Sequence, residues 1–326
     1  LLGSEGDLER WQMIQPKNNA NTETWNWSGL DAWVNANSAL GRDLVFTLFG
    51  TPPWTSARPN EDNAYSSYIG GVYYNRGIGA EPSDMTKWDA FCTAVAKRYF
   101  GKIKYYEVWN EVNYQNDGTG TTGTKSYWTG TYTKLAEMVR RANQAIKAVE
   151  PTAKIISPNV QGWVATPNQA SETFFTGMMA ASDGVGGTMK DWIDIVAVHL
   201  YLSGSNKIQD LAGMIDRINV AKTTAGVSVL PTWDTESAPI APDVSSLSDS
   251  QAKNLIARCM LTMAAKGIAR TIYYQYDNSM GFLNRPQIAA YREQIAALLR
   301  SGRILTVSRF TDGRVAYYTN SGLTII

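Results

Sequence analysis

The sequence predicts an α/β protein in which parallel strands are connected by helices. Along its 326 residues, short β-prone runs alternate with longer runs whose apolar residues recur at helical spacing. Repeated alternation of this kind is typical of a parallel sheet with helical crossovers. The length and the apolar fraction of 44% suit one large domain or two small ones.

The N-terminal half contains the first of these strand and helix pairs. Ser28 is expected to cap a helix over residues 28–40, and Ser83 is expected to cap a second helix. Between and after them we expect, in order, the strand Leu44–Phe49, a long loop over residues 50–82, the helix Ser83–Tyr99, a strand from Lys104 that ends at Glu111, and the helix Thr131–Glu150.

The C-terminal half repeats the pattern. Its expected elements are the strands Lys154–Ser157, Ile193–Tyr201, Val227–Glu236 and Arg270–Tyr276, and the helices Ser205–Thr224, Ser248–Gly267 and Gln287–Leu299. Ser248 and Gln251 have the spacing of a capping box at the start of their helix. The tail predicts a hairpin of Arg303–Phe310 and Arg314–Thr319, joined by residues 311–313.

The placement of polar residues favours a closed barrel over an open sheet. Apolar strands covered on both faces fit either architecture. Polar side chains lie at or just past the predicted strand ends: Glu111, Asn159, His199, Tyr201, Glu236 and Asp277. Since the carboxyl ends of the strands converge on one face of a (β/α)8 TIM barrel, we expect that fold for residues 1–300. Residues 301–326 would form a C-terminal hairpin packed on the barrel or completing it.

The strand count is one short of a full barrel. If Glu111 ends the fourth strand and Glu236 the seventh, the segment over residues 1–6 is the second strand and the first is missing. Either an N-terminal portion lies outside this sequence, or another segment such as the C-terminal hairpin replaces the first strand.

Composition excludes several classes of partner. Thirty basic and 29 acidic residues give a formal charge of +1, so no strong field would attract nucleic acid or an anionic membrane. No apolar run approaches the roughly 20 residues that a membrane span needs. A neutral or weakly charged small substrate fits better, and the 11 Trp and 17 Tyr offer flat faces on which sugar rings stack.

The few histidine and cysteine residues make other chemistries unfavourable. His199 is the single histidine, and no nucleophile-elbow motif accompanies it. Cys92 and Cys259 lie in apolar helical patterns and are expected to be free buried thiols. No residues have the spacing of a dedicated zinc site, so we expect neither a metal nor a cofactor.

Two glutamates at strand ends suggest hydrolysis of glycosides. Glu111 is the last residue of a Trp-Asn-Glu segment, Trp109–Glu111, at the end of a β-prone run. Glu236 ends a second β-prone run 125 positions later. Cleaving a glycosidic bond requires an acid for the leaving oxygen and a nucleophile or base on the other side of the sugar, and two carboxyl groups supply both. The alternative for each glutamate is an ion-paired residue at a strand end.

These residues resemble the clan A glycoside hydrolases, and look most like glycoside hydrolase family 39 and its bacterial relatives. The similar motifs are Trp109–Glu111 after a Tyr-Glu-Val strand, Val198–Tyr201, Thr235–Glu236, and Gly50–Trp54 after an earlier strand. They follow the family's order over roughly residues 8–290. Val112 departs from the family, which usually has a proline there, and the unassigned first strand is a second departure.

The resemblance implies a retaining mechanism in which Glu111 is the acid/base and Glu236 the nucleophile. Independently of the family, an acid needs a pKa near the working pH and a nucleophile must stay ionised. Asn110 is placed to donate to a sugar 2-hydroxyl, and Tyr201 to donate to Glu236. His199 is expected to hydrogen-bond either substrate or a neighbouring site residue, with a structural role at the strand end as the alternative.

Several other residues are candidates for binding substrate. Four aromatic residues follow or end strands and are suited to stacking on sugars, although ordinary packing explains each equally well: Trp54, Trp163, Trp233 and Tyr274. Trp233, close to Glu236 in sequence, is the strongest of them. Asn159 and Asp277 are further site candidates, and Asp234 is expected either near the site or in a buried salt bridge. The loop over residues 50–82 is long enough to form a cleft wall.

We therefore expect a retaining β-glycoside hydrolase that acts on a polysaccharide or oligosaccharide, in a secreted or periplasmic location. A non-catalytic carbohydrate-binding barrel and a transglycosylase with the same residues remain alternatives. The spread of aromatic residues over several loops favours endo action, because an extended groove would need such residues along its length.

Overall fold

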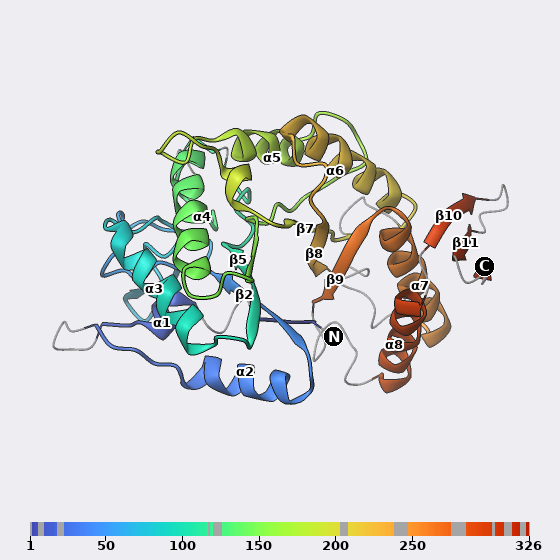
Figure 1. The fold of residues 1–326 in the computed structure, drawn as a ribbon, viewed down its shortest axis with the longest axis horizontal. Coiled ribbons are helices and arrows are strands. Elements are labelled where there is room, and N and C mark those ends of the chain that lie inside the picture. Colours follow the sequence, from blue (N-terminus) through green and yellow to red (C-terminus); the bar gives the residue numbers. More distant parts are fainter. Residues whose placement is uncertain are drawn as a thin grey trace. The chain divides into compact units, whose positions relative to one another are not determined.

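The computed structural model describes residues 2–5, 10–17, 23–116, 118–119, 126–202, 208–237, 247–274, 285–301, 304–309, 315–319 and 324–325. The chain divides into two compact units, coloured along the sequence in Figure 1. The first comprises Leu1–Gln161, Thr173–Ala197 and Lys222–Leu230, and the second comprises Gly162–Glu172, Val198–Ala221 and Pro231–Ile326.

A parallel sheet forms the centre of the first unit. Its strands are β1 (Leu2–Glu5), β2 (Asp43–Leu48), β5 (Ile103–Val108) and β6 (Lys154–Ile156), in the order β1-β2-β5-β6. All three pairings are parallel. The expectation that the first few residues form a strand is confirmed, since β1 pairs with β2 along its length.

Helices lie between and after these strands in the sequence. They are α1 (Trp11–Ile14), α2 (Ser28–Ala39), α3 (Met85–Arg98), α4 (Tyr132–Lys147), α5 (Ala170–Ala180), which begins in the second unit, and the 3₁₀ helix η1 (Met189–Trp192). Helices α3 and α4 lie side by side in Figure 1. Trp11 of α1 packs on Trp88 and Phe91 of α3, with ring centroids 5.5 and 5.1 Å away, so aromatic contacts join the start of the chain to α3.

Two expected helix caps are wrong. Helix α3 is capped by Asp84, whose carboxylate accepts the Thr86 N–H at 2.9 Å, while the Ser83 hydroxyl donates to the Thr55 carbonyl at 3.0 Å. Ser28 is already the first residue of α2, and its hydroxyl donates to the Asn26 side chain at 2.7 Å. In both cases the expected serine has a different hydrogen-bond partner.

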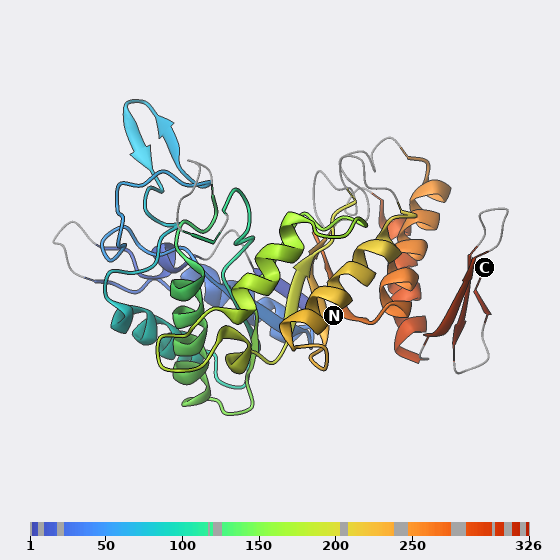
Figure 2. The same ribbon diagram turned by 90° about the horizontal axis from the view of Figure 1, so that it is seen from above.

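The long segment over residues 50–82 contains a hairpin that the sequence analysis did not predict. Strands β3 (Ser67–Ile69) and β4 (Val72–Tyr74) pair antiparallel around Gly70 and Gly71, both at positive φ. Figure 2 shows this hairpin standing away from the rest of the first unit. Arg58 anchors the segment through hydrogen bonds of 2.8 and 2.9 Å to the two carboxylate oxygens of Glu81.

The second unit has a sheet of three strands, β7 (Val196–His199), β8 (Thr232–Ser237) and β9 (Ile268–Tyr273), in that order, with β8 and β9 parallel. Its helices are α6 (Leu211–Ala225), α7 (Asp249–Ala265) and α8 (Pro286–Ser301); β7 begins and α6 ends in the first unit. The strand predicted from Val227 begins only at Thr232, because Val227–Leu230 forms a turn in which Val229 is 90% exposed.

The C-terminal residues form a small antiparallel sheet. The predicted hairpin is present as β10 (Ile304–Arg309) and β11 (Val315–Thr319), and β12 (Thr324–Ile325) adds a third strand. Strand β10 lies against α7. The predicted turn at residues 311–313 lies outside the described residues.

Two further expectations concern the thiols and the membrane. Cys92 and Cys259 are free and buried, as predicted. Burial raises the pKa of the Cys92 thiol, which keeps it protonated and unreactive.

Among the described helices, none is long and apolar enough to cross a membrane.

The confirmed capping box of α7 gives a test of the second unit. The Ser248 hydroxyl accepts the Gln251 N–H at 3.4 Å, and the Gln251 side chain accepts the Ser248 N–H at 2.9 Å. Ser248→Ala should lower the free energy of unfolding by about 1 kcal/mol in urea titrations, because a donor at the helix start loses its partner. Ser248→Thr, which keeps a capping hydroxyl, is the control. An unchanged stability of the alanine variant would contradict this cap.

Candidate active site

Glu111 lies on a left-handed turn that follows β5. The strand that was expected to end at Glu111 ends at Val108 instead, and the backbone then adopts φ values of 67° at Trp109 and 42° at Glu111. Bulky residues rarely occupy this region of φ, and such strain persists only where surrounding contacts enforce it. The turn therefore directs Glu111 away from the regular path of the strand.

Contacts of Trp109 hold the start of this turn. Its N–H donates to the Leu48 carbonyl at 2.9 Å, which extends the β2 pairing by one residue. Its indole N–H donates to the Tyr127 carbonyl at 3.0 Å, and its ring packs edge-on against Trp128 with centroids 4.8 Å apart. The Trp109 side chain is fully buried, so it serves as an anchor for the residues that follow.

The side chain of Asn159 holds the end of the turn. Asn159 follows β6 and is fully buried; its Oδ1 accepts the Glu111 N–H at 2.6 Å. Its Nδ2 donates to the Trp109 carbonyl at 3.4 Å and to the Asn110 Oδ1 at 3.3 Å. Asn159, expected as a site residue, thus positions the backbone that carries Asn110 and Glu111. A hydrogen bond from Asn110 to a sugar hydroxyl stays a prediction.

Beside Glu111 the structure groups three tyrosines. The Tyr127 ring centroid lies 5.1 Å from that of Tyr114 and 4.8 Å from that of Tyr65. Tyr114, whose N–H donates to the Glu111 carbonyl at 3.0 Å, is 36% exposed. Tyr65 lies in the long loop that was expected to form a cleft wall. Tyr114 and Tyr127 were not predicted: Tyr114 follows the end of β5 closely, which is a weak local signal, whereas Tyr127 lies just before α4 and has none.

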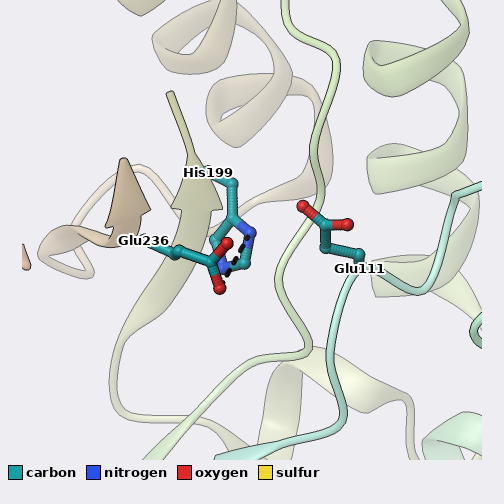
Figure 3. Close-up of side chains that lie close together, drawn as sticks. All are labelled: Glu111, His199 and Glu236. Carbon is teal, nitrogen blue, oxygen red and sulfur yellow. Dashed lines mark ion pairs between the residues drawn. The ribbon is translucent and has the colours of Figure 1, made fainter. Parts of the chain in front are cut away.

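Glu236 lies near the end of β8 in the second unit and accepts a hydrogen bond from Tyr201. The Tyr201 hydroxyl donates to Glu236 Oε1 at 2.6 Å, the contact that the sequence analysis expected. His199, at the end of β7, is 1% exposed, and its Nδ1 lies 4.0 Å from Glu236 Oε2, the pair marked in Figure 3. The second unit thus brings three predicted site residues together, and Glu236 receives a neutral donor on one oxygen.

Asp234, which was expected either near the site or in a buried salt bridge, lies close to this cluster. It is fully buried, its Oδ1 accepts the Leu200 N–H at 3.2 Å, and its Oδ2 accepts the Ser237 hydroxyl. Burial raises the pKa of Asp234 to about 7, and the negative charge of Glu236 acts in the same direction. The Ser237 hydrogen bond, the charge of His199 and the Leu200 N–H oppose this rise in the pKa.

The aromatic candidates differ in their surroundings. Trp233 is 4% exposed, and the Arg270 guanidinium covers its ring at 4.7 Å from the centroid, so these contacts favour the alternative of ordinary packing for Trp233. Trp163 is 1% exposed and belongs to the core. Trp54 is half-buried and donates its indole N–H to the Gln15 carbonyl at 3.0 Å. Tyr274 is 36% exposed.

One predicted site residue, Asp277, lies outside the described residues.

His199 and Glu236 each carry an atom that could bind a cation. The Tyr201 hydrogen bond already occupies one Glu236 oxygen, however. The Tyr201 hydroxyl and the His199 ring both lie beside Glu236, an arrangement that suits a carboxylate that reacts or binds a hydroxyl.

Comparison with known proteins supports the fold. No family model matches the chain, and no curated protein matches its sequence. Among solved structures, it is similar to a monomeric β-xylosidase from Caulobacter crescentus CB15 (TM-score 0.65, 15% identity, 98% of this chain and 63% of that one). It is also similar to the GH39 enzyme from Xanthomonas axonopodis pv. citri (0.61, 17%, 97% and 64%) and to a glucosidase from Croceicoccus marinus (0.61, 14%, 93% and 59%).

These structures show that the chain shares the fold of (β/α)8 glycosidases, including the GH39 enzyme. The sequence identity is too low for the likeness to carry more than the fold. The chain spans 59% to 64% of the length of these three proteins.

The raised pKa of Asp234 predicts a pH-dependent stability. Its folded-state pKa of about 7 exceeds the ordinary 3.8, so the folded protein holds an extra proton between these values. The stability that this proton contributes is present below about pH 4 and is lost as the pH rises through about 7. The asparagine in Asp234→Asn cannot ionise. As the pH rises through this window, the free energy of unfolding of the wild type should therefore fall relative to that of the variant, by up to about 1.4 kcal/mol per pH unit.

The measurement is urea unfolding of both proteins at several pH values. Comparing the two proteins at each pH cancels the contributions of all other titrating groups. A difference in unfolding free energy that stays constant from about pH 4 to 7 would contradict the raised pKa.

Proposed function

We propose that this chain belongs to a retaining β-glycoside hydrolase that cleaves a polysaccharide or oligosaccharide by double displacement. The observation that carries the proposal is the surroundings of Glu236: a buried histidine, a tyrosine hydroxyl on one oxygen and a side chain that is 26% exposed. A carboxylate that is hydrogen-bonded yet accessible is what nucleophilic attack on a sugar requires.

The fold supports the pairing of Glu236 with Glu111. The similar solved structures are (β/α)8 barrels, and we propose that the parallel strands of this chain belong to one such barrel. In such barrels, residues that follow different strands meet on the face formed by the carboxyl ends. Glu111 follows β5 and Glu236 is the penultimate residue of β8, so both belong to that class of position. The proposal requires their carboxyl groups to lie roughly 5–5.5 Å apart across one glycosidic bond.

The proposed reaction has two steps. In the first, Glu236 attacks the anomeric carbon while the Glu111 carboxylic acid gives its proton to the leaving oxygen, so the glycosidic bond breaks and a glycosyl ester forms. In the second, Glu111 removes a proton from water, which attacks the same carbon and releases Glu236. Two inversions give overall retention, and no metal or cofactor enters the balance.

The hydrogen bond from Tyr201 to Glu236 has a role in both proposed steps. It stabilises the negative charge of Glu236 before attack, because hydrogen bonds to ionised acceptors are stronger than neutral ones. When the ester forms, the hydroxyl is free to bind the ring oxygen or a neighbouring sugar hydroxyl. The His199 Nδ1 lies 4.0 Å from the other Glu236 oxygen.

The position of Glu111 supports its role as the acid/base. The Asn159 hydrogen bond fixes its backbone N–H, so the side chain starts from a rigid point. Tyr114 follows within one turn and exposes part of its ring. We assign Tyr114 and its neighbour Tyr127 to the sugar residue that departs with the leaving oxygen, since aromatic faces stack on sugars and Glu111 protonates that side.

Which sugar is cleaved depends on loops that the fold does not determine. The similar structures include a β-xylosidase and a glucosidase, so one fold accommodates different sugars. A panel of glycans with sizing of the products would identify the sugar and would show whether cleavage is internal, as an extended aromatic surface favours. Binding without release of reducing ends would indicate a carbohydrate-binding protein instead, and transfer to an added acceptor sugar would indicate a transglycosylase.

Replacement of the nucleophile is the first functional test. Glu236→Ala should lower kcat by roughly 10⁴-fold or more, because no group remains to form the ester. Added azide should restore part of the turnover and give a glycosyl azide of inverted configuration, which NMR of the product would detect. Glu293→Ala, a change at a solvent-accessible glutamate on α8, is the matched control and should retain full activity. Full activity of Glu236→Ala would refute the assignment.

Replacement of the acid should depend on the leaving group. Glu111→Ala should lower kcat/KM by roughly 10²- to 10⁴-fold for a natural glycoside, whose leaving oxygen needs a proton. An aryl glycoside with an acidic phenol needs no such help, so its first step should be spared. Rates for a series of phenols, plotted against phenol pKa, would measure this. Equal losses for good and poor leaving groups would exclude Glu111 as the acid.

A further inference from the structure

We propose that Asp234 is a positioning residue for the nucleophile. It stabilises the irregular segment of β8 that contains Glu236, and it connects this segment to the one that contains Tyr201. This inference rests on the proposed role of Glu236. Asp234 itself is fully buried, so it has no access to substrate and must act through its neighbours.

Strand β8 is irregular where Glu236 lies. Asp234 pairs with Thr271 of β9 and Ser237 pairs with Tyr273, so two residues of β8, Thr235 and Glu236, lie opposite one residue of β9. This is the arrangement of a β-bulge, which bends a strand and re-aims a side chain, often beside an active site. The hydrogen bond between the Ser237 hydroxyl and Asp234 connects the residues on either side of this bulge.

The second oxygen of Asp234 binds the segment after β7. It accepts the N–H of Leu200, the residue between His199 and Tyr201. Fixing this one N–H restrains both neighbours, whose side chains lie 4.0 Å and 2.6 Å from the Glu236 oxygens. A single buried carboxyl thus determines the backbone on both sides of the Tyr201 to Glu236 hydrogen bond.

The hydrogen bonds of Asp234 do not require a negative charge. The Leu200 N–H donates to the carboxyl group whether it is ionised or not, and the Ser237 hydroxyl can either donate or accept. Burial raises the pKa of Asp234 toward neutrality, which favours the uncharged form. An uncharged Asp234 also avoids a second negative charge close to Glu236, which must remain ionised to attack.

This arrangement makes asparagine a functional substitute for Asp234 and alanine a disruptive one. An asparagine side chain keeps an acceptor for the Leu200 N–H and a donor for the Ser237 oxygen. Alanine removes both partners and leaves a buried N–H unsatisfied. The informative set is therefore Asp234→Asn, Asp234→Ala, Tyr201→Phe and the double variant Asp234→Ala/Tyr201→Phe.

The first experiment needs no enzymatic activity. Hydrogen exchange of the Leu200 amide should be at least about tenfold faster in Asp234→Ala than in the wild type and unchanged in Asp234→Asn. The Val34 amide, which is buried in the middle of α2 of the first unit, should exchange equally in all variants and controls for global destabilisation. Equal protection of Leu200 in the alanine variant would overturn the anchor, even if the chain proved to hydrolyse no glycoside.

The second experiment is a kinetic double-mutant cycle on the glycoside found by the panel. Asp234→Ala and Tyr201→Phe should each lower kcat by roughly 10- to 100-fold with little change in KM, while Asp234→Asn should stay within about threefold of the wild type. Because both changes disturb the same hydrogen bond to Glu236, the double variant should be about as slow as the slower single variant. Losses that multiply, or an Asp234→Asn variant as slow as Asp234→Ala, would overturn the proposal.

Discussion

The side-chain amide of Asn159 makes the contacts on which the turn that carries Glu111 depends. Its three hydrogen bonds reach Trp109, Asn110 and the Glu111 N–H, and so hold a turn in which two large residues have positive φ. Strain of this kind costs of order 1–3 kcal/mol per residue and must be offset by surrounding contacts. Burial of the Trp109 ring between aromatic neighbours supplies another part of that compensation.

The second unit supports Glu236 in a different way. Glu236 lies in a bulge of β8, and the buried carboxyl of Asp234 joins the bulge to the segment after β7. In both units, the glutamate therefore lies where the strand has stopped following regular geometry, and a buried polar side chain stabilises the departure. Rigid support of this kind is what a reaction that tolerates little displacement requires.

The sequence predicted the features that local patterns determine. Alternating apolar periods indicated the parallel α/β fold, and the spacing of Ser248 and Gln251 indicated the capping box of α7. Strand ends with polar residues led to Glu111, Glu236 and the Tyr201 contact. The strand boundaries were less accurate: β5 ends at Val108 and β8 begins at Thr232.

The remaining features depend on contacts between distant residues. Asn159 binds Glu111 across 48 positions, and Asp234 binds Leu200 across 34, so no local pattern shows either contact. Trp233 looked suited to sugar stacking because it precedes Glu236 in sequence, but Arg270 from the neighbouring strand covers it. Cap assignments at Ser28 and Ser83 failed for a related reason, since each hydroxyl had a competing partner nearby.

The central claim is that Glu236 forms a covalent bond with the sugar. A 2-deoxy-2-fluoro glycoside with a good leaving group slows release of the ester, so the intermediate accumulates and can be located by mass spectrometry of proteolytic peptides. The expected result is one added fluorosugar on Glu236, with loss of activity at the same rate. Labelling of a different carboxylate, or continued hydrolysis with an inverted product and no labelled peptide, would contradict it.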